Sequence, residues 1–159
     1  MTINIRQKGA EGEREVAKLL TPIITEVMTA MAFPAAEIEA AQKMVQRNQN
    51  QSAVGGADLN NVFGMAVEVK RQEQLSVNTW WAQCVKSAER NKELPLLIWR
   101  QNRKPWRVRT YAWLPLPGGN PGEYNRQQMI VADFDIDTFK EWFRAWVRGK
   151  LEQGFEVKI

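Results

Sequence analysis

Three residues near the middle of the chain have the types and spacing needed for hydrolytic chemistry. Asp58 is followed by Glu68 and, two positions later, by Lys70. Side chains alternate across a strand, so Glu68 and Lys70 share one face while the valines beside them point to the opposite face. Turn-forming residues at 60–64 predict a hairpin that brings Asp58 beside Glu68. Two close carboxylates and a lysine are therefore expected at one place.

Two close carboxylates repel each other, so such a pair is expected to bind a cation. Carboxylate oxygens suit the hard divalent ion Mg²⁺, for which Mn²⁺ would substitute, and this ion completes its shell with water and phosphate oxygens. The Lys70 ammonium would hold a water activated by the metal and offset charge that develops on a phosphate. A Glu-x-Lys on an amphipathic strand can also be a solvated face, so the spacing alone leaves both interpretations open.

Composition narrows the chemistry further. The chain of 159 residues has 22 Lys and Arg against 18 Asp and Glu, a net charge of +4 that permits a nucleic-acid partner. It has no histidine and one cysteine, Cys84, which excludes imidazole catalysis, His-ligated zinc and an intrachain disulfide. Catalysis would have to use carboxylates, lysine or a water activated by a metal.

No targeting or membrane signal is evident. The first residues lack a charged segment followed by an apolar one, and no apolar run is long enough to span a bilayer. We therefore expect a cytoplasmic protein without a membrane partner.

The segments that would position these residues read as one domain, 1–159. Residues 6–27 have helical apolar spacing that Pro22 is expected to kink or split, and a second helix is predicted at 34–47. The chain after Lys70 is predicted to form a helix at 78–90 capped by Asn78 or Thr79, strands at 94–99 and 106–113, a loop at 114–124, a short strand at 129–132 and a helix capped by Asp135 or Asp137. This order predicts an α/β or α+β sandwich with a central mixed sheet flanked by helices.

Three short motifs together resemble the PD-(D/E)XK nuclease superfamily. They are Gly-(x3)-Glu-Arg at 9–14, Gly-Gly-Ala-Asp at 55–58 and Glu-Val-Lys at 68–70. Within that superfamily they look most like archaeal and bacteriophage Holliday junction resolvases. The resemblance implies a restriction-endonuclease-like fold and a Mg²⁺-dependent endonuclease that resolves four-way junctions by paired nicks. Ala57 replaces the proline that names the motif, and a proline there contributes backbone shape, not ligands.

The same resemblance assigns roles to further residues. Glu13 would approach the metal beside Asp58 and Glu68, Gln83 would face the site, and Arg47 and Ser52 would touch the scissile phosphate. Lys8 and Arg71, which flank these motifs, are expected to contact DNA. Relative to compact resolvases, the helix at about 34–47 looks like an insertion.

A basic hairpin is a second candidate DNA contact. Arg107 and Arg109 share one strand face, and Arg103 and Lys104 lie in the turn that precedes it. These basic side chains could simply be exposed to solvent, or they could bind the phosphates of DNA next to a metal site.

The expected partners are branched DNA and a second copy of the chain, in a bacterium or a phage-infected host cell. Two cuts need two sites, and the helix at 38–44 or the aromatic final helix has apolar surface for a homodimer. Two other functions remain open: a restriction-like or repair endonuclease on duplex DNA, and a DNA-binding module without catalysis.

Overall fold

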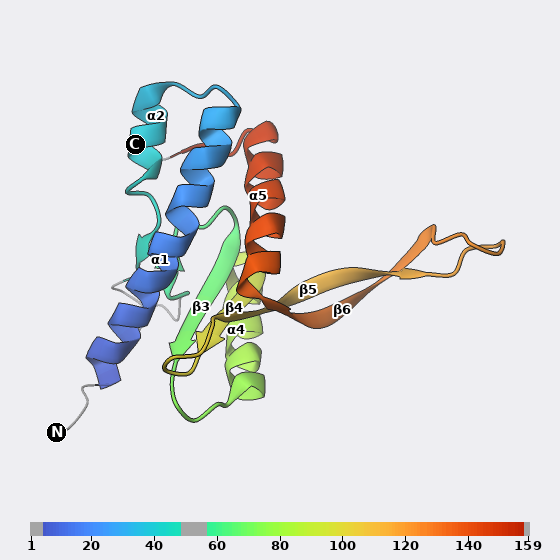
Figure 1. Ribbon diagram of the computed structural model, residues 1–159, viewed down its shortest axis with the longest axis horizontal. Helices are drawn as coiled ribbons and strands as arrows, with labels where there is room; N and C mark the ends of the chain where they lie inside the picture. The colour runs from blue at the N-terminus through green and yellow to red at the C-terminus, as the bar shows by residue number, and fades with distance from the viewer. Residues whose placement is uncertain (1–4, 49–56, 158–159) are drawn as a thin grey trace.

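The computed structural model describes residues 5–48 and 57–157. The elements are α1 (Ile5–Ala30), α2 (Ala35–Ala41), β1 (Gln46–Arg47), β2 (Leu59–Asn60), β3 (Met65–Arg71), α4 (Val77–Asn91), β4 (Leu94–Arg100), β5 (Arg107–Leu116), β6 (Arg126–Asp135) and α5 (Ile136–Glu152) (Figure 1). The strands form one six-stranded sheet in chain order. The β3–β4 pair is parallel and the other neighbouring pairs are antiparallel. The predicted mixed sheet is confirmed.

Helices cover both faces of the sheet. The long helices α1 and α5 lie side by side on one face, and α4 lies on the other (Figure 1). Strand β4 is buried on both sides, with Ile98 in the core under α1 and α5 and with Leu97 and Trp99 against α4. A strand covered on both faces reads as a continuous apolar run, as Leu94–Trp99 does.

Helix α1 runs without a break through Pro22. Its apolar face, including Val16, Leu20 and Ile24, is buried in the main core. Pro22 is exposed, so water can bond the carbonyl that its missing N–H leaves free. The predicted possibility that Pro22 splits the helix is therefore wrong.

The second helix is shorter than predicted. It ends at Ala41, and the last two residues of the predicted segment, Gln46 and Arg47, form β1 and pair with β2. Pairing with β2 supplies hydrogen bonds to the backbone groups of Gln46 and Arg47 that a longer helix would have bonded internally. This tertiary contact outweighs the helical apolar spacing of residues 34–47.

The β5–β6 hairpin is longer than predicted. Strand β5 continues to Leu116 and β6 spans Arg126–Asp135, so the residues at 114–116 belong to a strand rather than to a loop. The ladder extends to the Leu116–Arg126 pair and supplies cross-strand hydrogen bonds despite Pro115 and the polar Gln127 and Gln128. The outer part of this hairpin projects from the body of the molecule (Figure 1).

The two predicted helix caps differ in outcome. Ser76, not Asn78 or Thr79, occupies the N-cap position of α4, and Asn78 instead accepts a hydrogen bond from Arg109 at 2.9 Å. Asp135 caps α5 as predicted, since its carboxylate accepts from the Thr138 N–H at 2.7 Å.

Replacing Asp135 with Ala is expected to cost the most stability above about pH 4, and progressively less as the pH falls below that value. The hydrogen bond from Thr138 lowers the Asp135 pKa below its ordinary 3.8. A lowered folded-state pKa gives stability that is present above the ordinary pKa and is lost as pH falls through the lowered one. Thermal melts of both proteins between pH 2 and pH 7 measure this; a melting difference that stays constant down to pH 2 would contradict it.

Candidate active site

A cavity of about 460 Å³ lies between the start of α1 and the end of β3. It is lined by Lys8, Gly9, Glu13, Asp58, Val69, Lys70, Arg71, Gln72, Glu73 and Gln74. Three stretches of chain that are far apart in the sequence therefore meet at one place. Five of the predicted site residues are in this lining, Lys8, Glu13, Asp58, Lys70 and Arg71, and the lining adds Gln72, Glu73 and Gln74.

Asp58 is fixed at this cavity by the predicted hairpin. Leu59 of β2 pairs with Val67 of β3, and residues with positive φ, Asn61, Phe63 and Gly64, form the turn. The Asp58 N–H donates to the Val67 carbonyl at 2.9 Å. Its carboxylate accepts from the Val69 N–H at 2.7 Å, and the residue is buried. The backbone of β3 thus holds the carboxylate in one orientation.

Glu68 lies beside Asp58. The two carboxyl groups are within hydrogen-bonding reach of each other, and both are largely shielded from water. Burial, together with the charge of Asp58, raises the pKa of Glu68 to about 8. Burial also raises the pKa of Asp58, although the hydrogen bond from Val69 opposes this rise. Two like charges held together in a poorly solvated place carry an electrostatic cost that a bound cation would remove.

Lys70 follows Glu68 on the same side of β3. Its positive charge lowers the pKa of both Asp58 and Glu68, which places the ammonium near the carboxylate pair. Val67 and Val69 point into the main core, as the strand alternation predicted. The half-buried Lys70 lines the cavity and is positioned to meet a ligand there.

The donor set fits a hard divalent cation. Asp58 and Glu68 offer adjacent carboxylate oxygens with excess negative charge, which is the ligand chemistry that Mg²⁺ prefers. Within residues 5–48 and 57–157, no group of three His, Cys, Asp or Glu side chains is arranged to hold a metal. Water and phosphate oxygens would therefore complete the shell, as is usual for Mg²⁺.

Glu13 reaches the same cavity from α1. It is 7% exposed, and its charge raises the pKa of both Asp58 and Glu68. Its carboxylate accepts a hydrogen bond from Arg47 Nε at 2.5 Å. Glu13 thus stands near the carboxylate pair and holds Arg47, and its role as a third metal ligand stays a prediction.

The predicted DNA contacts Lys8 and Arg71 lie at the cavity, and both form ion pairs. Lys8 is 3.6 Å from Glu73, and Arg71 is 2.8 Å from Glu15. Glu15 also contacts Arg100 at 2.9 Å. The sequence did not mark Glu15 as a bridge between these arginines, because the contacts join residues that are far apart along the chain.

Gln83 and Ser52 are the remaining site residues that the resemblance implied. Gln83 is exposed on α4, which packs through Trp80 and Cys84 on the face of the sheet to which Glu68 and Lys70 also point. It is not among the residues that line the cavity, and its role in the site stays a prediction. Ser52 lies outside the described residues.

The basic hairpin residues are used in different ways. Arg109 bonds Asp133 at 2.6 Å and lies 5.9 Å from the centre of the Trp99 ring, so it is committed to internal contacts. Arg103, Lys104 and Arg107 are exposed. Lys104 and Arg107 line another cavity, of about 370 Å³, which also includes Leu75 and Val77 near the start of α4.

No helix in the described part of the chain has the length and apolar character needed to cross a membrane.

Comparison with known proteins identifies the family. A model of the family described as "Phage putative PDDEXK endonuclease" matches residues 4–149. A search of curated proteins found no match. The matched region contains the whole cavity lining and all the elements of the sheet, which agrees with the predicted PD-(D/E)XK motifs and restriction-endonuclease-like fold. The finer resemblance to junction resolvases receives no confirmation from this match. The chain belongs to this phage family of PD-(D/E)XK endonucleases.

Proposed function

We propose that this protein is a Mg²⁺-dependent, structure-selective DNA endonuclease that resolves four-way junctions by paired nicks. The observation that carries the proposal is the shielded Asp58–Glu68 pair with Lys70 beside it at an open cavity. The preference for junctions is supported by the Lys8–Glu13 segment, because the residues that resemble resolvases line the same cavity.

Asp58 and Glu68 would hold the metal. When bound, Mg²⁺ supplies positive charge that polarises the scissile phosphate and makes a nearby water easier to deprotonate. Mn²⁺ is expected to substitute, since the same oxygen donors suit it.

The remaining work belongs to side chains of the cavity. The Val69 N–H keeps the Asp58 carboxylate in position, so little reorganisation is needed when substrate arrives. The Lys70 ammonium would orient the attacking water and offset the negative charge that develops on the phosphate. Arg47, held by Glu13, would bind a phosphate oxygen next to the cut. These groups position substrate and stabilise charge.

Resolution of a junction also implies two copies of the chain. Each chain has one Asp58–Glu68–Lys70 constellation, and a four-way junction must be cut in two strands related by approximate two-fold symmetry. A symmetric dimer supplies two equivalent sites through one self-complementary interface.

The direct test is incubation with end-labelled four-way junction, linear duplex, flap and single strand, each with Mg²⁺ and with chelator. The proposal expects cleavage of the junction, in Mg²⁺ alone, at two opposed positions. Equal cutting of duplex would favour a restriction-like or repair enzyme. Binding to every DNA without cleavage, with or without Mg²⁺, would favour a DNA-binding module.

The exposed hairpin cations give a separate prediction. Replacing Lys104 and Arg107 together with Ala should weaken binding to all DNA shapes and lower the slope of log affinity against log salt by about 2, because each lost phosphate contact removes roughly 0.9. The matched control replaces Lys43 and Lys86, two exposed lysines outside the hairpin, with Ala. Fluorescence anisotropy at several salt concentrations measures the slope; the same slope in wild type and the hairpin variant would assign these residues to the solvated surface.

A further inference from the structure

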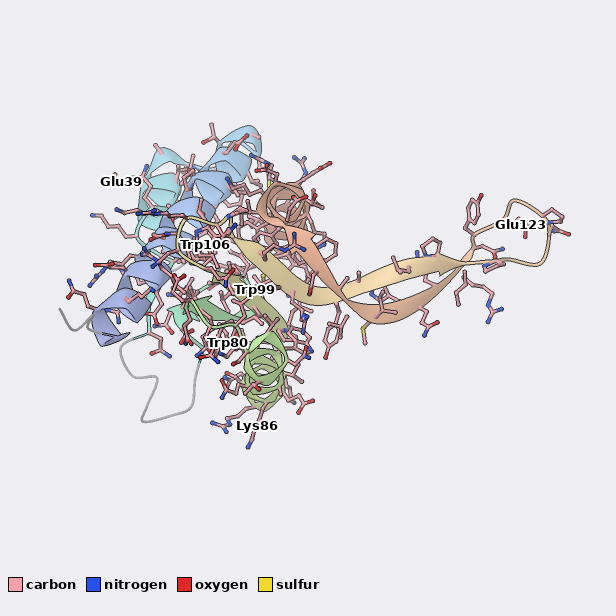
Figure 2. The ribbon with its side chains drawn as sticks, turned by 60° about the horizontal axis from the view of Figure 1, so that its bottom comes forward. Glu39, Trp80, Lys86, Trp99, Trp106 and Glu123 are labelled. Carbon is pink, nitrogen blue, oxygen red and sulfur yellow. The ribbon has the colours of Figure 1, made fainter. Side chains whose placement is uncertain are left out.

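The projecting part of the β5–β6 hairpin, residues 111–131, is here called the arm. Figure 2 shows Glu123 at its far end, well away from the helices. The arm exposes large apolar side chains, with Trp113 at 63%, Tyr124 at 71%, Met129 at 48% and Val131 at 44%. Elsewhere in the described chain, Leu75 is the exposed hydrophobic of this size. Apolar side chains concentrated on one projecting element mark an interaction surface.

The charge of the arm argues against DNA as its partner. Between residues 110 and 132 the charged residues are Glu123 and Arg126, which cancel. Arg109 and Asp133, just outside this range, are bonded to each other at 2.6 Å. A surface that follows phosphates needs an excess of positive charge, which the arm lacks.

The arm also presents a free sheet edge. β6 is the last strand of the sheet and is ten residues long, whereas β1 at the opposite edge has two. β6 contains no proline or lysine, two residues that commonly protect an edge from pairing. The backbone groups along its outer side are therefore suited to pair with another strand.

We propose that β6 pairs antiparallel with β6 of a second copy of this chain, which joins the two sheets across a two-fold axis. The proposal deepens the dimer that the proposed paired cuts require. It also moves the main contact away from the two surfaces expected from the sequence, while Trp142 and Trp146 of α5 remain at its margin. Phe139, Phe143 and Val147 of α5 and Met44 beyond α2 are buried in the core of their own chain.

Symmetry and side-chain chemistry select the register. Directly opposed residues on antiparallel strands point to the same face, so a two-fold axis must place one residue opposite its own copy. With Ile130 at the centre, Met129 lies opposite the partner's Val131, and two exposed apolar residues meet. A centre at Val131 would place Met129 opposite the partner's Asp133, and a centre at Met129 would place Val131 opposite the partner's Gln127. The centre at Ile130 is therefore favoured.

An apolar groove at the base of the arm extends the interface. Its volume is about 580 Å³, and Trp113, Leu114, Met129, Trp142 and Trp146 contribute to its lining. Because the paired strands run in opposite directions, the tip of the partner's arm reaches the base of this arm, where the groove opens. The groove gives the exposed Tyr124 near the tip an apolar surface to contact.

Sedimentation equilibrium without DNA or metal tests the interface. Wild type is expected to be dimeric, and the double variant Met129→Lys/Val131→Lys to raise the dimer dissociation constant at least about tenfold, because it places like charges opposite each other on the paired strands. The control is Leu75→Lys, an apolar residue of similar exposure, 43%, outside the arm. Melting curves of each variant show whether the chain remains folded. A monomeric wild type, or a folded double variant as dimeric as Leu75→Lys, would overturn the proposal.

A gain of cross-linking gives a second readout. Among single cysteine variants at positions 128–132, Ile130→Cys should form the inter-chain disulfide fastest under mild oxidation, and wild type should form none because Cys84 is buried. No cross-link at any of these positions would overturn the interface. A monomer that still cuts DNA would overturn the interface and leave the nuclease function standing. A cross-linked dimer that cuts no DNA would support the interface and overturn the proposed function.

Discussion

Replacing Glu68 with Gln is expected to abolish Mg²⁺-dependent cleavage and also to stabilise the metal-free protein. The variant removes a carboxylate that would hold the metal, and loss of one such electrostatic group typically costs about a hundredfold or more in rate. It also removes the repulsion and desolvation that raise the pKa of Glu68 to about 8. In a protein of this size, each 1 kcal/mol gained would raise the melting temperature by roughly 2–4 °C.

Thermal melts with and without Mg²⁺ separate these effects. Mg²⁺ should stabilise wild type, because a ligand that binds the folded state shifts the unfolding equilibrium, but should not stabilise Glu68→Gln. Asp58→Asn should lose both cleavage and the Mg²⁺ response. Lys70→Met should lose cleavage and keep the response, since it removes no oxygen ligand.

Glu39→Gln is the matched control, since Glu39 is exposed on α2 and should behave as wild type in both assays. Cleavage at near wild-type rate by Asp58→Asn, Glu68→Gln or Lys70→Met would place the active site elsewhere. Equal Mg²⁺ stabilisation of wild type and Glu68→Gln would remove Glu68 from the metal site.

Dimers that combine one wild-type chain with one Glu68→Gln chain should convert a supercoiled cruciform plasmid mainly to nicked circles. The first nick releases the supercoiling, and the extruded junction then collapses. Linear product therefore requires the second site to cut within the same encounter. Wild-type dimers are expected to give linear product, because both of their sites are intact.

The mixed dimers can be isolated by co-expression with two different affinity tags and two purification steps. Gel electrophoresis of the plasmid products then gives the ratio of linear to nicked DNA. Wild-type dimers carrying the same pair of tags are the control for the tags. Mixed dimers that linearise the plasmid as efficiently as this control would mean that one site makes both cuts or that successive encounters suffice.

Local patterns determined the centre of the site. The alternation along β3 separates Glu68 and Lys70 from the core valines, and the turn at 60–64 returns the chain so that Asp58 meets that strand. The apolar spacing of α5 and its Asp135 cap follow from the same kind of information. These features depend on residues a few positions apart, which is the range over which strand and helix periods act.

Tertiary structure decided the surroundings of the site. Glu13 meets Arg47, and Glu15 joins Arg71 to Arg100, through contacts between separate elements that no local pattern specifies. The same holds for the shielding that raises the Glu68 pKa. The arm is a further case, because proline, glycine and glutamine favour a loop when they are considered alone, while pairing with a neighbouring strand stabilises β5 and β6 to their full length. Periodicity shows which face of an element is apolar, and packing decides which distant residues that element meets.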